Sequence, residues 1–144
     1  MATYRYPLDK FKRGTAFGVK DTAHPNGHRG SDYNGFAEGT PVHAVADGVI
    51  ALNNWSDVLG WVIVLSVKVG LKKQYWGYCH LHEQSHLVKG NKIKLGDVLG
   101  KAGTSGSASS GVHLHLTLGN TANSVFSGAV KDADAFLVKQ IGKK

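Results

Sequence analysis

The chain has 144 residues, of which 42% are hydrophobic and 19% charged. This balance suits one globular domain and excludes a disordered chain. The single cysteine excludes an intramolecular disulfide and a four-cysteine zinc site, and no apolar run approaches the roughly 18 residues of a membrane helix. The net charge of +7 favours polyanionic partners such as nucleic acid, anionic lipid or anionic cell-wall polymers. A basic surface without a specific partner is an equally open alternative.

The hydrophobic pattern predicts a mostly β domain with largely antiparallel strands. The first 40 residues are rich in glycine and proline, so we expect loops with short strands there. Further strands are expected at 42–52, interrupted at Asp47-Gly48, at 60–67, at 73–81, at 92–100 as two short strands around a turn, and at 112–118. We also expect a hairpin turn at 68–72, a loop of small polar residues at 103–111, and one short C-terminal helix at 132–141.

Two of the eight histidines share one face of the strand expected at 112–118. Side chains alternate along a strand, so His113, His115 and Thr117 point one way, and the intervening leucines point into a core. The two imidazoles then lie about 6.5–7 Å apart, because a strand rises about 3.3 Å per residue. One histidine could bind a metal while the other faces a substrate; a polar outer face is the alternative interpretation.

A second His-Leu-His occurs at 80–82. Alternation along its strand predicts that Tyr78 and His80 share a face, whereas Cys79 points away from His80 and is a buried structural thiol. The pattern alone does not decide between His80 and His82 as the functional histidine.

The segment His28-Arg29-Gly30-Ser31-Asp32 contains two ordinary zinc ligands, an imidazole and a carboxylate. Pro25 and Gly27 disfavour a helix, so these side chains would meet through a loop or an extended turn. Two nitrogens and one carboxylate oxygen suffice for a catalytic zinc site with a fourth position open to water.

These elements, in this order, resemble the lysostaphin/LytM-type zinc endopeptidases, which cut peptide cross-links in bacterial peptidoglycan. The resemblance covers roughly residues 14–119 and implies an antiparallel sheet with long loops and a substrate groove. It is carried by Phe17-Gly18, by the His-x-Gly-x-Asp motif at 28–32, by Gly39-Thr40-Pro41-Val42 with Asp47-Gly48-Val49, by Tyr78-Cys79-His80-Leu81, by the glycine-punctuated run 94–106, and by His113-Leu114-His115.

Carried over motif by motif, the resemblance implies that His28, Asp32 and His115 hold one Zn²⁺. It also implies that His80 and His113 are catalytic histidines outside the metal shell, which favours His80 over His82. These two would position the attacking water, take its proton, or donate to the leaving amine. The remaining histidines match no motif position and are expected to be structural or surface residues: His24, His43, His82 and His86.

Two further features concern the substrate side of the expected site. Tyr78, placed on the face of His80, could donate a hydrogen bond to the oxyanion or pack beside the groove. Family members often continue His-Leu-His with an aromatic residue and a glutamate, whereas this chain has Leu116-Thr117. That departure concerns local packing or substrate fit.

The expected protein is a zinc-dependent endopeptidase that hydrolyses cross-links or stem peptides of peptidoglycan, as a monomer with a single domain spanning 1–144. Residues 1–6 show no signal peptide. This fits a phage endolysin held in the host cytoplasm until lysis, and equally a domain of a longer protein. Anionic cell-wall polymers fit the basic charge, and membrane insertion is not expected. The sequence leaves open whether a glycine-rich bridge or a D-Ala–diaminopimelate link is cut.

Three other functions compete with this interpretation. A non-catalytic LytM-like module would bind the wall or activate another hydrolase, but all five functional motif positions are filled here. A D-Ala-D-Ala carboxypeptidase is kept open by the Glu-x-x-His spacing of Glu83 and His86. A nucleic-acid-binding protein would need a basic stripe or an aromatic platform, and the sequence contains neither.

Overall fold

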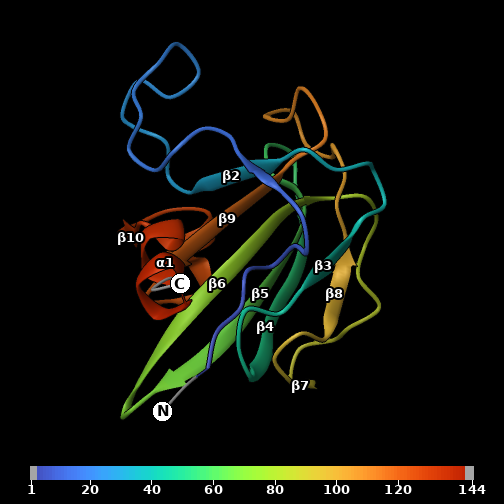
Figure 1. Ribbon diagram of the computed structural model, residues 1–144, viewed down its shortest axis with the longest axis vertical. Helices are drawn as coiled ribbons and strands as arrows, with labels where there is room; N and C mark the ends of the chain where they lie inside the picture. Colours follow the sequence, from blue (N-terminus) through green and yellow to red (C-terminus); the bar gives the residue numbers. More distant parts are fainter. Residues whose placement is uncertain (1–2, 142–144) are drawn as a thin grey trace.

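The computed structural model describes residues 3–141 and shows two antiparallel sheets and one C-terminal helix (Figure 1). The main sheet has the strand order β1-β2-β9-β6-β5-β4-β7, with β10 added alongside β9, and β3 pairs with β8 in the second sheet. The elements are β1 (Lys12–Arg13), β2 (Ser31–Asn34), β3 (Pro41–His43), β4 (Gly48–Ser56), β5 (Gly60–Val69), β6 (Lys72–Leu81), β7 (Lys92–Ile93), β8 (Val98–Lys101), β9 (Leu114–Gly119), the 3-10 helix η1 (Ala122–Val125), β10 (Val130–Lys131) and α1 (Ala133–Ile141). The predicted mostly β antiparallel fold with one short C-terminal helix is confirmed.

The segments 42–52 and 92–100 each divide between the two sheets. β3 and β8 form the second sheet, whereas β4 and β7 pair in the main sheet. Between them the two chain segments run side by side, because Ala44 N–H donates to the Asp97 carbonyl and Gly96 N–H donates to the Ala44 carbonyl. The expected interruption at Asp47-Gly48 is therefore a crossing from one sheet to the other.

The hydrophobic core lies between the main sheet, the second sheet and α1. Leu114, Leu116 and Leu118 of β9 all point into it, as alternation along the strand predicts. The opposite face of the main sheet has a smaller apolar cluster that includes Cys79 of β6 and Val125 of η1. No helix among residues 3–141 is long and apolar enough to cross a bilayer.

Candidate metal centre and active site

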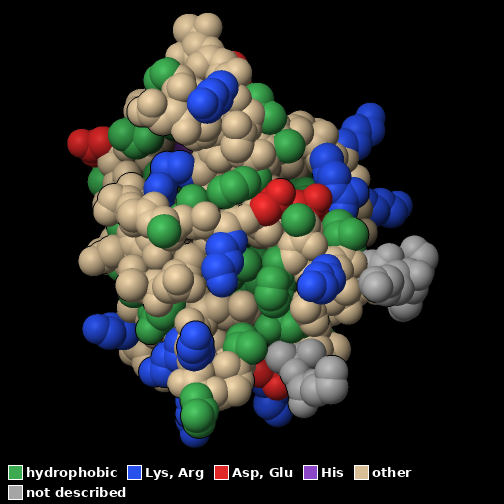
Figure 2. All heavy atoms as spheres, turned by 90° about the vertical axis from the view of Figure 1, so that its left-hand side faces the viewer, with side chains coloured by type: hydrophobic (Ala, Val, Ile, Leu, Met, Phe, Trp, Pro, Cys, Tyr) green, Lys and Arg blue, Asp and Glu red, His purple; other side chains and the backbone are tan. Residues whose placement is uncertain are grey.

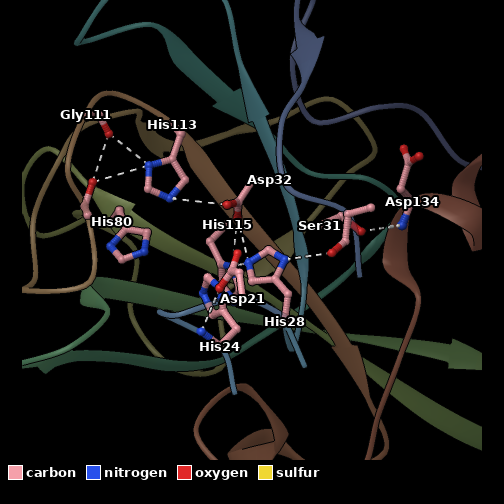
Figure 3. A network of polar contacts seen from close by, with 12 residues as sticks. Asp21, His24, His28, Ser31, Asp32, His80, Gly111, His113, His115 and Asp134 are labelled. Atoms are coloured by element: carbon pink, nitrogen blue, oxygen red, sulfur yellow. Dashed lines mark hydrogen bonds and ion pairs between the residues drawn. The ribbon is translucent and has the colours of Figure 1, made fainter. Parts of the chain in front are cut away.

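β2 and β9 lie side by side and place two of the expected zinc ligands opposite each other. Asp32 and His115 are register partners, so their side chains leave the sheet on the same face. His28 lies in the loop before β2, where its N–H donates to the Val19 carbonyl at 2.9 Å and its carbonyl accepts from Gly18 N–H at 2.8 Å. These bonds fold the loop back so that the His28 ring lies beside Asp32 (Figure 3).

Glycine at position 30 permits this close approach. A Cβ at Gly30 would lie 2.6 Å from the Leu116 carbonyl oxygen and 2.8 and 2.9 Å from two atoms of the His115 imidazole. Carbon atoms do not tolerate such separations, so a side chain at position 30 would displace His115.

The three candidate ligands present one donor atom each to a common point. His115 Nδ1 lies 3.1 Å from His28 Nε2 and 3.0 Å from Asp32 Oδ1, and His28 Nε2 lies 3.2 Å from the same carboxylate oxygen. Within residues 3–141 this is the one group of three or more His, Cys, Asp or Glu side chains arranged to hold a metal ion.

This triangle of donor atoms fits a zinc ion. A tetrahedral zinc site with bonds of about 2.0–2.1 Å has ligand atoms about 3.3–3.4 Å apart, close to the separations observed here. His28 Nδ1 lies 3.2 Å from the Ala16 carbonyl oxygen, which can only accept, so Nδ1 carries the hydrogen of the neutral ring. The Nε2 lone pair is therefore free for a metal.

The charges of the cluster also suit a cation. Burial acts to raise the pKa of Asp32, but hydrogen bonds and charge interactions with His115 and His28 outweigh it and hold this pKa well below its ordinary value. Burial lowers the pKa of His115, which keeps its ring neutral and able to bind a metal. Burial also acts to lower the pKa of His28, yet its hydrogen bond to Asp32 raises it overall.

His80 lies next to this cluster, at an irregularity in β6. Its ring centroid is 4.7 Å from that of His113 and 6.0 Å from that of His115. Its Nδ1 lies 2.6 Å from the Ser105 carbonyl oxygen, so the neutral ring carries its hydrogen on Nδ1 and has a free lone pair on Nε2. Burial lowers the pKa of His80 to about 4, so the ring is neutral at physiological pH.

His113 lies between His80 and Asp32 and is partly exposed (Figure 3). Its Nδ1 donates to the Gly111 carbonyl at 2.9 Å, with Ser109 Oγ at 3.3 Å, and its Nε2 lies 3.9 Å from Asp32 Oδ2. The structure thus brings together all five histidine and aspartate side chains that the sequence motifs singled out.

Two expectations about β6 are wrong. Tyr78 pairs with Leu116 and Cys79 pairs with His115, so Tyr78 faces the core and Cys79 faces the candidate site. Tyr78 is fully buried, burial raises its pKa, and its hydroxyl oxygen accepts the Val45 N–H at 3.1 Å. It therefore lies across the sheet from the site and not beside His80. Cys79 is buried as expected, but on the face that carries His115.

Three of the four remaining histidines lie away from the candidate site, and one packs against it. His43 contacts the Gly96 carbonyl, His82 pairs with Glu38, and Glu83 and His86 line a different hollow. The Glu-x-x-His spacing thus does not contribute to the metal group. His24 is the exception, because its ring packs on His28 with a centroid separation of 4.6 Å. The Pro-Asn-Gly sequence between these two histidines favours a turn, and this turn is the feature of the sequence from which the contact could have been predicted.

The His-Asp-His donor triangle with two further imidazoles beside it is an arrangement that catalytic zinc sites of hydrolases use. The comparisons with known proteins identify the family within that class. Residues 26–127 match the model of peptidase family M23. The chain therefore belongs to this family, whose members are zinc metallopeptidases.

Three relatives describe the similarity in more detail. The glycyl-glycine endopeptidase ALE-1 of Staphylococcus capitis is 30% identical over 135 residues, which cover 90% of this chain and 34% of that protein. The chain thus spans about a third of the length of this curated relative. The lysostaphin catalytic domain from Staphylococcus simulans has a TM-score of 0.75 at 28% identity, covering 88% of this chain and 92% of that one. The catalytic domain of the prophage-encoded M23 protein EnpA from Enterococcus faecalis has a TM-score of 0.73 at 25% identity, covering 92% and 95%.

Proposed function

We propose that this chain is a zinc endopeptidase that cleaves peptide bonds in bacterial peptidoglycan, with His28, Asp32 and His115 as the zinc ligands. The observation that carries the proposal is the triangle of His28 Nε2, Asp32 Oδ1 and His115 Nδ1, with separations of 3.0–3.2 Å. The family membership supports it, because these residues occupy the His-x-Gly-x-Asp and His-x-His motifs. A bound zinc ion supplies Lewis-acid chemistry, lowering the pKa of a water molecule and polarising the scissile carbonyl.

His80 and His113 are the proposed catalytic histidines. The low pKa of His80 keeps its Nε2 unprotonated and able to accept a proton from an attacking water. His113 Nδ1 donates to the Gly111 carbonyl, and its Nε2 lies 3.9 Å from Asp32 Oδ2, next to the donor triangle. This position suits His113 to donate a proton to the leaving amine.

The name of one relative supports a proposal for the bond that is cut. ALE-1 is named a glycyl-glycine endopeptidase, so we propose a glycine-containing cross-link as the first candidate and a D-Ala–diaminopimelate link as the second. The loop 103–111 consists of small residues and contacts His113 through Ser109 and Gly111, and we propose that it borders the bound peptide. A hollow of about 70 Å³ is lined in part by Asp32.

We further propose that residues 1–144 act as one monomeric domain of a phage endolysin. The similarity to a prophage-encoded M23 protein supports this context. The test is expression in the cytoplasm of a host with a matching wall: lysis only after the membrane is permeabilised supports an endolysin. Cells that keep intact walls after permeabilisation, with active enzyme present, contradict it.

Digestion of purified peptidoglycan of glycine-bridged and directly cross-linked types tests the proposed reaction, with mass spectrometry of the released fragments. Peptides with new amino termini should appear, disappear with a zinc chelator, and return when zinc is restored. Their masses identify the bond. An absence of cleavage from every wall type by the zinc-loaded protein would contradict the proposal and favour the non-catalytic wall-binding module.

A further inference from the structure

β6 contains an extra residue next to the candidate active site. Tyr78 pairs with Ile63 and Leu81 pairs with Trp61, so three steps along β6 oppose two steps along β5. His80 lies within this bulge and has φ = 62°, the one positive φ of a non-glycine residue among residues 3–141. Such a conformation is strained and persists only where the surroundings hold it.

Ser105 contacts the bulge through both its backbone and its side chain. Its carbonyl oxygen lies 2.6 Å from His80 Nδ1, and its Oγ donates to the Leu81 carbonyl at 2.5 Å. The same Oγ accepts the Trp61 N–H at 3.1 Å. His80 N–H itself donates to the Leu59 carbonyl at 2.7 Å.

We infer that Ser105 is a positioning residue for His80. Its hydroxyl bridges β5 and β6 at the point where their pairing is interrupted, and this bridge places the Ser105 carbonyl where His80 Nδ1 must donate. The ring is thereby held in the Nδ1–H form with Nε2 free on the side of His113 and His115. This inference rests on the proposed catalytic role of His80.

Neighbouring contacts hold Ser105 in this position. The loop 105–108 is joined to the turn between β4 and β5, since Ser107 N–H donates to the Asp57 carbonyl at 2.8 Å and Ala108 N–H donates to the Val58 carbonyl at 3.0 Å. Gly60 has φ = +73°, and a Cβ there would overlap the side chain and the carbonyl group of Ser105. Two substitutions should therefore move Ser105 out of this position. One removes its hydroxyl group, and the other adds a methyl group at position 60.

The first test compares Ser105→Ala with Ser127→Ala, a control at an exposed serine after η1 and outside the loop 103–111. Steady-state kinetics on soluble cross-linked peptidoglycan fragments should show that Ser105→Ala lowers kcat by about 10- to 100-fold with KM within about threefold, since loss of an orienting contact loosens the reacting group. Zinc content should be unchanged. Ser105→Thr keeps the hydroxyl and should retain kcat within about threefold of the parent.

The second test displaces Ser105 without changing any polar group. Gly60→Ala should reproduce the loss of kcat. Gly70→Ala is the matched control, because Gly70 also has positive φ (+62°) but has nothing within 4 Å of its added Cβ and lies at the far end of β5. Both variants place a side chain at a positive φ, and of the two only Gly60→Ala brings its added Cβ against Ser105.

The outcomes separate this inference from the proposed function. His80→Gln with normal kcat would overturn the role of His80 itself. A large loss in His80→Gln, together with kcat within twofold of the parent in folded Ser105→Ala, would overturn the positioning role alone. Equal losses in the alanine and threonine variants would also overturn it, because the hydroxyl would then not matter. If Ser105→Ala does not fold, the comparison of Gly60→Ala with Gly70→Ala decides: equal kcat in the two overturns the inference.

Discussion

Gly30 determines how closely the loop carrying His28 approaches His115. Gly30→Ala adds a methyl group 2.6 Å from the Leu116 carbonyl oxygen and within 3 Å of the His115 ring. We expect zinc affinity to fall by about 10- to 100-fold, because the ring must move although no ligand is replaced. Competition with a chromogenic chelator measures this. Gly111→Ala is the control, since nothing lies within 4 Å of its added Cβ, and equal affinity in both variants would contradict the steric argument.

The buried ring of His80 should make the free energy of unfolding depend on pH. Its folded-state pKa of about 4 lies below the ordinary value of 6.5. Between these values the unfolded chain takes up a proton at His80 and the folded chain does not. Stability should therefore fall as the pH falls from 6.5 to 4, by up to about 3 kcal/mol from this group.

Urea denaturation of the parent and of His80→Gln, both in chelator, isolates this contribution. The difference in unfolding free energy between the two proteins should decrease by up to about 3 kcal/mol from pH 7 to pH 4. A constant difference across this range would mean that the folded-state pKa of His80 is ordinary.

At the scale of elements, α1 is tied to the strand that carries Asp32. The buried Tyr33 hydroxyl of β2 donates to Asp134 Oδ1 at 2.7 Å, and Arg13 Nε of β1 donates to Asp134 Oδ2 at 2.8 Å. Asp134→Ala leaves the Tyr33 hydroxyl without its acceptor, so we expect a loss of about 1–3 kcal/mol in the free energy of unfolding. Arg13→Ala breaks a half-exposed ion pair and removes the guanidinium from the rings of Tyr6 and Phe11, and it should cost about 1–2 kcal/mol.

A double-mutant cycle checks the cause of that loss. Tyr33→Phe removes the donor, so Asp134→Ala should cost less in the Tyr33→Phe background, with a coupling of about 1 kcal/mol in chemical denaturation. Additive effects would show that the two side chains act independently, and the stabilisation of β2 by α1 would then have another source.

The strands show which side-chain orientations could be predicted from the sequence. The strict alternation of leucine and polar residues in β9 was sufficient to orient His115, because that strand is regular there. The same rule failed in β6, where the bulge after Tyr78 shifts the register. Nothing in the residues 78–81 themselves marks that bulge, since it depends on contacts with Leu59 and Ser105 from other segments. The grouping of His28 with Asp32 and His115 could be predicted only from the family resemblance, because a loop has no periodicity that orients its side chains.

At the scale of the whole molecule, the sequence predicts an interrupted strand for each of the two segments, 42–52 and 92–100, that cross between the sheets. A turn signal such as Asp47-Gly48 indicates where pairing stops, but it does not indicate which sheet the next strand joins. Burial accounts for the partner, because Val42 of β3 and Leu99 of β8 are both buried in the core that the two sheets share. Strand positions could therefore be predicted from the sequence, and the layering could not.

The net charge of +7 is spread over the surface, and Figure 2 shows lysine and arginine side chains distributed over the face it presents. The electric field of this charge should attract the protein to the anionic polymers of an intact wall. At 0.1 M salt this attraction is largely screened beyond a distance of about 10 Å. We therefore expect cleavage of intact walls to slow several-fold between 0.05 and 0.5 M salt. Cleavage of a small neutral cross-link peptide should change less than twofold.

A charge-reversal variant tests whether the field itself is responsible. Lys68, Lys72 and Lys73 are exposed at the tip of the β5–β6 hairpin, at the opposite end of β6 from His80. Replacing all three by glutamate changes the charge by two units per residue and lowers the net charge from +7 to +1. The variant should cleave the small peptide at the parent rate, cleave walls more slowly at low salt, and lose most of the salt dependence. A parent-like response to salt on walls would show that the long-range charge does not bring the enzyme to its substrate, and the basic surface would then serve solubility alone.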